Sequence, residues 1–363
     1  MHGDNDLLWL FLPQEKNNRR RQHQKLALLF QNCNIPLSSL FNEVTTNMDK
    51  ICYFAPATSA NLSAGYDLLG LALNFEYHSK ALGDKVTVSK ASEPGVQIGQ
   101  IMGVPKDALP FSPDKNTASV AVKALLDHVQ YSGGIVLDIE KNMPLCSGMG
   151  SSAASAAAAV VATNHLLDLN LSKKQLIPFA MQGEKAASGN AHADNVAPAL
   201  LGGIVVIRSY FPLDIIRLPV PDNLYISIIH PNIEINTAQA RSLVPPQISV
   251  AHCTQQMGNI ASFISGLFLN DMKLVSQGIE DWIAEPYRAI SIPGFSLVKQ
   301  AAIEAGALGA GLSGSGPSMF AFSDSIEVAQ KSALKMSKVF ERQHISNHVY
   351  YGKISTQGAH QIF

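Results

Sequence analysis

The sequence predicts an α+β fold arranged as two layered domains. Segments with strand-like and helix-like apolar spacing are mixed along the chain. A Pro-rich stretch at residues 219–222 separates two predicted strands and marks a domain boundary. The chain has 363 residues, 47% of them hydrophobic, which is enough for two domains with a large core. We therefore expect one domain at residues 48–220 and a second at residues 221–363.

In the first predicted domain, residues 51–55 favour a strand that enters a loop at Pro56. Residues 86–89 and 135–139 favour two further strands. Between these two, residues 116–129 have the apolar spacing of a helix. A second helix is expected to begin at Ser152 and to end near Leu169. The remaining predicted elements of this domain are a helix over 173–188 and a buried strand over 204–207, after the Gly202-Gly203 turn.

In the second predicted domain, residues 224–230 favour a strand. Long helical stretches are expected over 250–285 and 294–306. Two more strands are expected, at residues 318–322 and near Val349. This mixture of elements is the basis of the α+β prediction.

Composition excludes several classes of function. The net charge is −1, so no basic excess indicates a nucleic-acid partner. No apolar run reaches the about 18 residues that a membrane span needs, so no membrane association is expected. The 4 cysteines are scattered without zinc or disulfide spacing. We therefore expect an enzyme with reduced thiols and a cytoplasmic location.

Residues 1–47 differ from the rest of the chain. The apolar run at residues 7–12 is short and follows Asp4 and Asp6, whereas a secretory signal has a basic start and a longer apolar core. The basic cluster at residues 19–21 and the nearby acidic residues match a transit peptide poorly. We expect a poorly ordered extension, or a start codon assigned upstream of Met48.

The most informative segment is a small-residue loop, residues 144–154, that leads directly into a strong helix former. Its two glycines, Gly148 and Gly150, can adopt backbone angles that other residues resist. The N–H groups at the start of the helix have no intrahelical partner, and with the helix dipole they form an anion site. The sequence therefore indicates phosphate binding, although the loop is not a Walker A motif. The alternative is an ordinary capped helix with a flexible lead-in.

A second loop, residues 55–70, is rich in small hydroxyl and amide side chains and includes Asp67. Asn61 and Asp67 are either turn stabilisers or parts of a substrate loop in which Asp67 holds a cation. A third loop, residues 309–318, satisfies G-x-G-x-x-G, but a helical pattern precedes it and a strand follows. A dinucleotide fold needs the reverse order, so we expect a turn close to a ligand or to the other glycine loop.

Together, the segments 56–70, 144–154 and 306–317 resemble the three motifs of the GHMP small-molecule kinases. Within that family, the segments 192–198 and 285–295 are most similar to those of the kinases that phosphorylate L-homoserine. The resemblance covers about residues 50–363. It implies a two-domain fold, with an N-terminal nucleotide-binding α+β domain, a C-terminal ferredoxin-like domain and the ligands in the cleft between them.

The resemblance also implies ATP and Mg²⁺ as cofactors. It implies that Ser152 and Glu184 hold the metal, because Mg²⁺ accepts few protein oxygens. The residues expected to bind the nucleotide are Asn116, Lys141, Pro144, Leu145, Cys146, Ser147, Gly148, Met149, Gly150, Ser151, Ser152, Ala153 and Ala154. Glu184 also has a simpler interpretation, as a solvated charge in a Glu-Lys helix pattern, and Lys141 and Asn116 could likewise have only structural roles.

For a homoserine substrate, the resemblance implies that Arg241 and Arg288 bind the carboxylate, where a guanidinium fork suits two oxygens. Asp67 is expected to face the ammonium group and Asn61 to contact the reacting hydroxyl. His192, Asp194 and Asn195 are expected to shape the same pocket. Asn61, Glu184 and His192 are the expected catalytic residues, with His192 a candidate proton relay and no dedicated general base evident.

Two alternative functions stay open at this point. One is phosphorylation of mevalonate, shikimate or a sugar, against which the combination of Asp67 with two arginines argues. The other is a catalytically silent family member, against which the presence of both Ser152 and Glu184 argues. A homodimer is an expectation from the resemblance alone.

Overall fold

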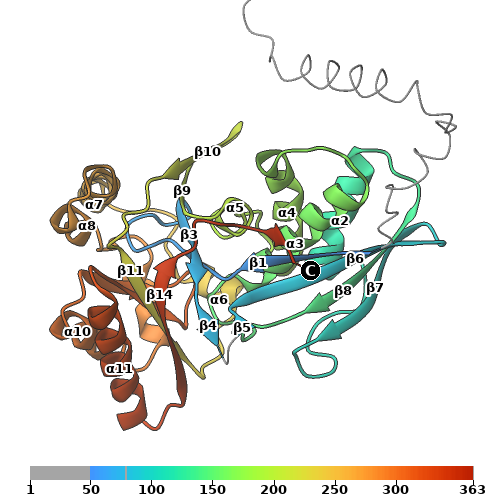
Figure 1. Ribbon diagram of the computed structural model, residues 1–363. Coiled ribbons are helices and arrows are strands. Elements are labelled where there is room, and N and C mark those ends of the chain that lie inside the picture. The colour runs from blue at the N-terminus through green and yellow to red at the C-terminus, as the bar shows by residue number, and fades with distance from the viewer. Residues whose placement is uncertain (1–49, 78–79, 363) are drawn as a thin grey trace, which may run out of the picture. The chain divides into compact units, whose positions relative to one another are not determined.

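The computed structural model describes residues 50–77 and 80–362 (Figure 1). By its internal contacts the chain divides after Met48, and residues 49–363 form one of its two compact units. The predicted extension at residues 1–47 lies outside the described residues. Two large β-sheets organise the described part, and a separate pair of short strands accompanies them, β4 (Glu76–Tyr77) and β5 (Lys80–Ala81).

The first sheet has five strands, in the order β15 (His360–Gln361), β1 (Lys50–Pro56), β6 (Gly83–Ala91), β8 (Gly134–Glu140) and β7 (Gly95–Met102). Neighbours are antiparallel except β7 and β8, which are parallel. Buried and half-buried residues alternate along β8, because successive side chains point to opposite faces. The strands predicted at 51–55, 86–89 and 135–139 are confirmed within this sheet.

Two helices pack on this sheet, α2 (Thr117–His128) and α3 (Ser151–Leu166), and α4 (Lys173–Ser188) packs on both of them. In Figure 1 they lie together beside β1 and β6. Nearly all of α3 is buried, because its alanine-rich sequence has no polar face. The helices predicted at 116–129 and 173–188 are confirmed. The helix predicted over 152–169 ends earlier, at Leu166, because Asp168 and Asn170 have positive φ angles of 51° and 58°.

The second sheet has eight strands. Seven follow the order β10 (Leu213–Leu218), β9 (Ile204–Tyr210), β3 (Leu69–Asn74), β14 (Asn347–Ile354), β11 (Tyr225–Pro231), β13 (Met319–Ser323) and β12 (Gly309–Leu312), and β2 (Thr58–Ala60) pairs with β3. The strands predicted at 204–207, at 224–230, at 318–322 and near Val349 are confirmed, with the second and the third each shifted by one residue. Strands from both sides of residue 220 share this sheet through the pairing of β3 with β14. The boundary between residues 220 and 221 therefore stays a prediction.

Two helices pack on the second sheet, α10 (Phe295–Glu304) and α11 (Ile326–Arg342). The sequence analysis did not predict α11, although its buried Ala329, Ala333, Met336 and Phe340 follow helical spacing. The remaining helices are α5 (Val196–Leu201), α6 (Thr237–Ser242), α7 (Val250–Leu269), α8 (Met272–Gln277), α9 (Glu285–Arg288) and a 3-10 turn (Ala289–Ser291). The long helical stretch expected over 250–285 is therefore interrupted. Asn270 ends α7 at φ 54°, and Asp271 caps α8.

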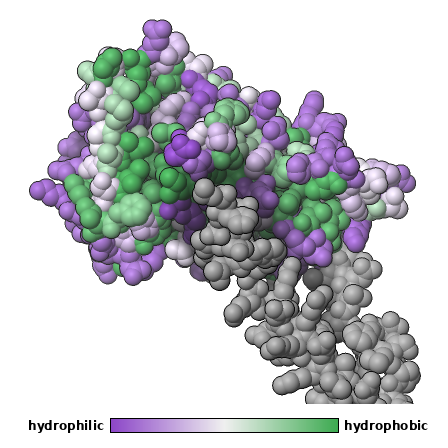
Figure 2. Space-filling model, turned by 90° about the horizontal axis from the view of Figure 1, so that it is seen from above, coloured by the Kyte–Doolittle hydropathy of each residue, from purple (hydrophilic) through white to green (hydrophobic). Residues whose placement is uncertain are grey.

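The outer surface mixes hydrophilic and hydrophobic side chains, as Figure 2 shows for the face seen from above. On α7, Phe263 and Leu267 are buried, while Val250, Met257 and Phe268 are exposed. Within the described ranges, no helix combines the length and the apolar character needed to cross a bilayer.

Candidate active site

The first loop makes a left-handed turn before it reaches the pocket. Three consecutive non-glycine residues, Asn61, Leu62 and Ser63, have φ angles of 69°, 46° and 63°. Such angles are costly for L-residues and persist only where the surroundings hold them. The Asn61 side chain supplies part of that hold: its Oδ1 accepts from the Asp67 N–H at 3.0 Å, and its Nδ2 donates to the Gly314 carbonyl at 2.9 Å. Asn61 thus joins the first loop to the third.

The second and third loops also touch. The Ser313 hydroxyl donates to the Gly148 carbonyl at 2.8 Å and lies 2.9 Å from Ser59 Oγ. A Cβ added at Gly148 would come within 2.6 Å of the Ser313 carbonyl oxygen, so only glycine fits there. The sequence analysis expected the third loop to lie against another glycine loop, and this is confirmed. The first part of that loop is strand β12 rather than a turn.

The second loop ends at the N-terminus of α3. Gly150 precedes the helix at φ 67° and supplies no side-chain cap, so the first N–H groups of α3 have no capping partner from this residue. A Cβ at Gly150 would lie 1.9 Å from Thr58 Oγ1, which shows how closely the loop passes over β2. The backbone there therefore offers a positively polarised helix start that suits an anion.

Beneath this helix start lies a buried ion pair. Lys141 is 4% exposed, and its ammonium group contacts the Asp84 carboxylate, the Ser151 carbonyl at 2.9 Å and Ser155 Oγ at 2.9 Å. These contacts occupy all three donors of the ammonium group. In this geometry Lys141 holds the first turn of α3, and its direct contact with phosphate stays a prediction. The sequence analysis missed Asp84, which no local motif indicates.

Glu184 reaches the same helix start from α4. Its side chain lines the same pocket as Ser152, the second residue of α3, and lies close enough to influence it. Burial raises the pKa of Glu184, while the nearby Ser152 hydroxyl and the Lys141 charge act in the opposite direction. The two predicted metal ligands are thus adjacent, although they come from different helices. Within the described ranges, no group of three or more His, Cys, Asp or Glu side chains could hold a metal by itself.

A pocket of about 490 Å³ joins the three loops. Of the predicted site residues, it is lined by Asn61, Asp67, Asn116, Lys141, Leu145, Cys146, Ser147, Gly148, Gly150, Ser151, Ser152, Glu184, His192, Asp194, Asn195, Arg241 and Arg288. Four predicted nucleotide residues do not line it: Pro144, Met149, Ala153 and Ala154. The side chains of Met149, Ala153 and Ala154 pack in the core instead.

Sequence reasoning missed several residues of this pocket. Leu109, Pro110 and Ile139 give it an apolar wall next to Asn116. Asn116 itself caps α2, since its Oδ1 accepts from the Ala118 N–H at 3.0 Å. Leu109 and Pro110 lie in a loop and Ile139 lies in β8, and ordinary apolar residues there give no sequence signal for a binding site, so only the folded chain reveals this wall.

At the other end of the pocket, Asp67 and Arg241 form a two-pronged ion pair. Arg241 Nη2 lies 2.7 Å from Asp67 Oδ1, and Nη1 lies 3.0 Å from Oδ2. His192 Nδ1 is 3.8 Å from the same carboxylate. Because burial lowers the pKa of His192 despite the Asp67 charge, the imidazole is neutral near pH 7 and this contact is not an ion pair. The two residues expected to bind opposite ends of a substrate are therefore paired with each other.

Arg288 lies beside this ion pair, but its hydrogen-bond acceptors are backbone carbonyls. It is 4% exposed and donates to the Ala240 and Gly314 carbonyls at 3.1 and 3.2 Å. Among the described residues, no carboxylate forms an ion pair with Arg288. A buried guanidinium without an anionic partner is costly. Its position in the pocket wall therefore favours an anionic ligand.

Asp194 and Asn195 border both ends of the pocket. Asn195 Oδ1 accepts from the Thr58 hydroxyl at 2.7 Å, which ties this segment to β2. Burial raises the pKa of Asp194 to about 7, and the nearby Asp67 charge adds to the effect. The Asn195 N–H, 3.0 Å from Asp194 Oδ1, acts in the opposite direction.

This raised pKa predicts a pH-dependent stability. The folded state keeps a proton that the unfolded chain loses near pH 4, so the contribution is fully present below the ordinary pKa and is lost as pH rises through about 7. Asp194→Asn removes the titration. We expect its melting temperature to rise relative to the unmodified protein between about pH 5 and pH 8, by at most roughly 1.4 kcal/mol of stability per pH unit.

Thermal melting of both proteins across that range is the measurement, with the exposed Asp222→Asn as the control. Parallel pH profiles for Asp194→Asn and the unmodified protein would show that Asp194 titrates normally.

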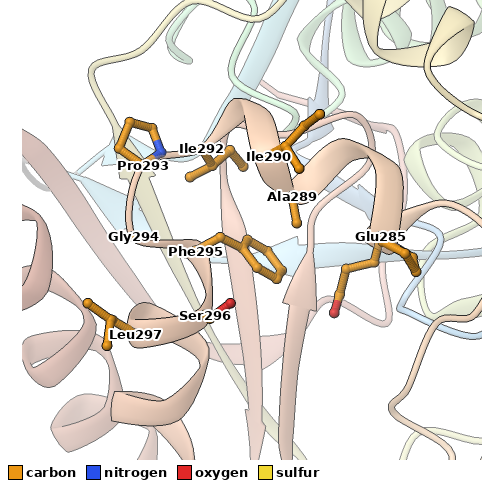
Figure 3. Close-up of a pocket in the computed structure, with 10 residues that line it drawn as sticks. Glu285, Ala289, Ile290, Ile292, Pro293, Gly294, Phe295, Ser296 and Leu297 are labelled. Carbon is orange, nitrogen blue, oxygen red and sulfur yellow. The ribbon is translucent and has the colours of Figure 1, made fainter.

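A larger hollow of about 620 Å³ lies elsewhere, on α9, the 3-10 turn and the start of α10. Figure 3 shows apolar side chains such as Ile292 and Phe295 around it, with Glu285 at one edge. The Glu285 carboxylate already accepts from Lys299 at 2.5 Å. Few polar groups converge there, so the smaller pocket at the three loops is the candidate active site.

Two family models match the chain. Residues 116–203 match the GHMP kinases N terminal domain, and residues 260–342 match the GHMP kinases C terminal domain. The chain is 44% identical to a homoserine kinase of Chlorobium phaeobacteroides (strain BS1), over 87% of this chain and 100% of that relative. The chain belongs to the homoserine kinases of the GHMP kinase family. As a member of this kinase family, it uses ATP as phosphoryl donor.

Other homoserine kinases agree. The protein of Chlorobaculum tepidum is 42% identical over 87% of this chain and 99% of its own. The crystal structure of the homoserine kinase from Cytophaga hutchinsonii superposes with a TM-score of 0.82 at 46% identity, covering 86% of this chain and 98% of that one. A mevalonate kinase of L. major, at 17% identity and a TM-score of 0.64, shares the fold. The GHMP fold expected from the three motifs is thus confirmed.

Proposed function

We propose that this chain transfers the γ-phosphoryl group of ATP to the side-chain hydroxyl of L-homoserine, giving O-phospho-L-homoserine and ADP for threonine biosynthesis. The observation that carries the proposal is one pocket with two unlike ends. One end is a helix start suited to phosphates, and the other holds Asp67, Arg241 and Arg288. The curated relatives at 42–44% identity carry the same name, homoserine kinase.

The nucleotide is proposed to enter at the helix end. Backbone N–H groups from Ser147 to Ser152 would surround its phosphates, and the apolar wall of Leu109, Pro110 and Ile139 would cover its base. Lys141 and Asp84 would keep the first turn of α3 in place beneath the phosphates.

Mg²⁺ is part of this proposal, and the side chains at the helix start fit it. The Ser152 hydroxyl and the Glu184 carboxylate line the same pocket and lie near each other at the start of α3. One or two protein oxygens, with substrate phosphates and waters, are what Mg²⁺ typically accepts. When bound, the ion neutralises negative charge on the phosphates during transfer.

The amino-acid substrate would exchange with the Asp67–Arg241 pair. A zwitterion brings one ammonium group for Asp67 and one carboxylate for Arg241, so both charges stay compensated when the pair opens. A molecule with only one of these groups leaves the other partner of this half-buried pair without compensation, which is unfavourable. Arg288, which has no carboxylate partner among the described residues, would receive the substrate carboxylate together with Arg241.

The reacting hydroxyl is proposed to lie between Asn61 and His192. The Asn61 amide retains one N–H and one oxygen lone pair beyond its two observed bonds. His192 Nε2 is buried and has no hydrogen-bond partner among the described residues, and its lowered pKa keeps the ring able to accept a proton. The proton would pass from the hydroxyl to His192 or directly to the transferred phosphate.

A coupled assay of ADP release tests the substrate. We expect turnover with L-homoserine and much less with mevalonate or shikimate. 4-Hydroxybutyrate, which lacks the ammonium group, and 3-amino-1-propanol, which lacks the carboxylate, should each lose roughly 10- to 100-fold in kcat/KM, because one charged hydrogen-bond partner is missing. Equal turnover of 4-hydroxybutyrate would contradict the homoserine assignment and favour another GHMP substrate.

A cytoplasmic location and a homodimer complete the proposal, both on the resemblance to the family and on composition. The pocket geometry supports a small-molecule substrate as the partner of this chain. Size-exclusion chromatography with light scattering measures the oligomeric state, and the expected mass is twice that of one 39.0 kDa chain.

A further inference from the structure

Two positively charged side chains converge on one aromatic ring at the substrate end of the pocket. The Arg288 Cζ atom lies 5.1 Å from the Tyr66 ring centroid, and the Arg241 Cζ atom lies 5.6 Å from it. Burial is the main cause that lowers the pKa of Arg288, and the nearby Arg241 charge acts in the same direction. Two like charges near one point repel each other, so a group that attracts both would stabilise the arrangement.

Of the two arginines, only Arg241 has a carboxylate partner among the described residues. Asp67 is engaged with Arg241 through both of its oxygens, whereas Arg288 contacts carbonyl oxygens and, at 3.4 Å, the Tyr66 hydroxyl. The face of an aromatic ring carries partial negative charge and attracts a guanidinium group, more strongly where water is excluded. The Tyr66 ring is therefore the one group, among the contacts described, that faces both arginines at once.

The backbone hydrogen bonds that position Asp67 also position the neighbouring Tyr66. Tyr66 immediately precedes Asp67, whose N–H is held by Asn61 Oδ1 at 3.0 Å. Asp67 itself has a φ of 58°, and Tyr210 donates to its carbonyl at 2.9 Å. Burial raises the pKa of Tyr66, so the phenol stays neutral and able to donate. Of these two consecutive residues, Asp67 contacts Arg241 by charge, and the Tyr66 ring contacts both arginines.

We propose that Tyr66 is a positioning residue that holds Arg241 and Arg288 together as a single carboxylate-binding site. The inference rests on the proposed function, because the carboxylate is that of the amino-acid substrate. Its ring, rather than its hydroxyl, carries the role, since the hydroxyl contact reaches only one arginine and is long. Without the ring, the two guanidinium groups keep only their separate contacts, with Asp67 and with backbone carbonyls, and lose the group that they share. Carboxylate binding is therefore expected to weaken while the nucleotide end is unaffected.

The test compares Tyr66→Leu with Tyr66→Phe, using steady-state kinetics with L-homoserine and ATP varied in turn. Tyr66→Leu is expected to raise the KM for homoserine about 5- to 30-fold and to leave the KM for ATP within about twofold. Tyr66→Phe keeps the ring and is expected to leave both KM values within about threefold. Tyr351→Leu, at an exposed tyrosine on β14, is the matched control for loss of a ring.

A second measurement separates the carboxylate from the rest of the substrate. The inhibition constant of 3-amino-1-propanol, which has no carboxylate, should differ by less than about threefold between Tyr66→Leu and the unmodified enzyme. An equal loss for both ligands would overturn the proposal and indicate general damage to the pocket. A Tyr66→Phe variant as impaired as Tyr66→Leu would also overturn it, because the hydroxyl would then be the essential group.

These outcomes are distinct from failure of the proposed function. If the unmodified enzyme does not turn over homoserine, the substrate assignment fails before Tyr66 is considered. If it does, and Tyr66→Leu keeps the homoserine KM unchanged, the substrate assignment stands and the role given to Tyr66 is wrong. If Tyr66→Leu does not yield folded protein, the Tyr66→Phe result decides alone. An unchanged KM for homoserine supports the role of the ring, and a raised KM contradicts it.

Discussion

Glu184→Gln and Ser152→Ala each lower kcat by roughly 100-fold while the fold is retained, because each removes one of two adjacent oxygens at the start of α3. The glutamine keeps the size and the hydrogen-bonding capacity of Glu184 but not its charge. We expect the two losses to be non-additive, since either change already disturbs the same metal site. Initial rates at saturating ATP and homoserine provide the measurement.

A titration with Mg²⁺ distinguishes a metal site from a structural contact. Raising Mg²⁺ should restore part of the activity in each variant, and Glu304→Gln, at an exposed glutamate on α10, should behave like the unmodified enzyme throughout. A Glu184→Gln variant with near-normal kcat across the titration would contradict the metal assignment and leave Glu184 as a structural residue of the pocket wall.

The second large effect is expected at the junction of the glycine loops. Gly148→Ala places a Cβ within 2.6 Å of the Ser313 carbonyl and 2.8 Å of the Gly316 carbonyl. Because both obstacles are backbone atoms, the two loops must separate, and the phosphate site moves with them. We expect kcat/KM to fall on the order of 100-fold, as for a displacement of about 1 Å in an active site.

Gly189→Ala is the control for backbone strain. Gly189 has φ 80°, close to the 76° of Gly148, but an added Cβ there meets no atom within 4 Å. The control should cost about 1 kcal/mol of stability and little activity. Equal activity losses in the two variants would show that the left-handed backbone, and not the contact between the loops, is what matters.

Local sequence patterns were sufficient for the elements that surround the nucleotide end. The helix predicted over residues 173–188 has the same bounds as α4. Ser172 and Gln175 form a capping box at its start, which can be recognised from four consecutive residues of the sequence. The phosphate loop was also predictable, because its glycines and serines precede an alanine-rich helix. Such signals lie within one segment, so no tertiary information is needed to read them.

The features that the sequence did not reveal depend on partners far apart in the chain. The sequence predicts Lys141 at the phosphates, but its ammonium group forms an ion pair with Asp84, which lies 57 residues earlier in the chain. Arg241 and Asp67 were expected to bind opposite ends of a substrate, and they pair with each other across 174 residues. No sequence pattern indicates a role for Tyr66, because its contacts are with two arginines from distant segments of the chain. Pairing across such separations is decided by the fold and not by spacing.

Phosphorus NMR of the complete reaction tests the central claim most directly. The enzyme, ATP, Mg²⁺ and L-homoserine should yield a phosphomonoester signal coupled to a neighbouring CH₂ group, in equal amount to the ADP formed, because transfer is to the side-chain hydroxyl. This readout separates phosphoryl transfer from simple ATP hydrolysis, which a count of ADP alone does not. ADP accompanied only by inorganic phosphate, or no reaction with homoserine, would contradict the account.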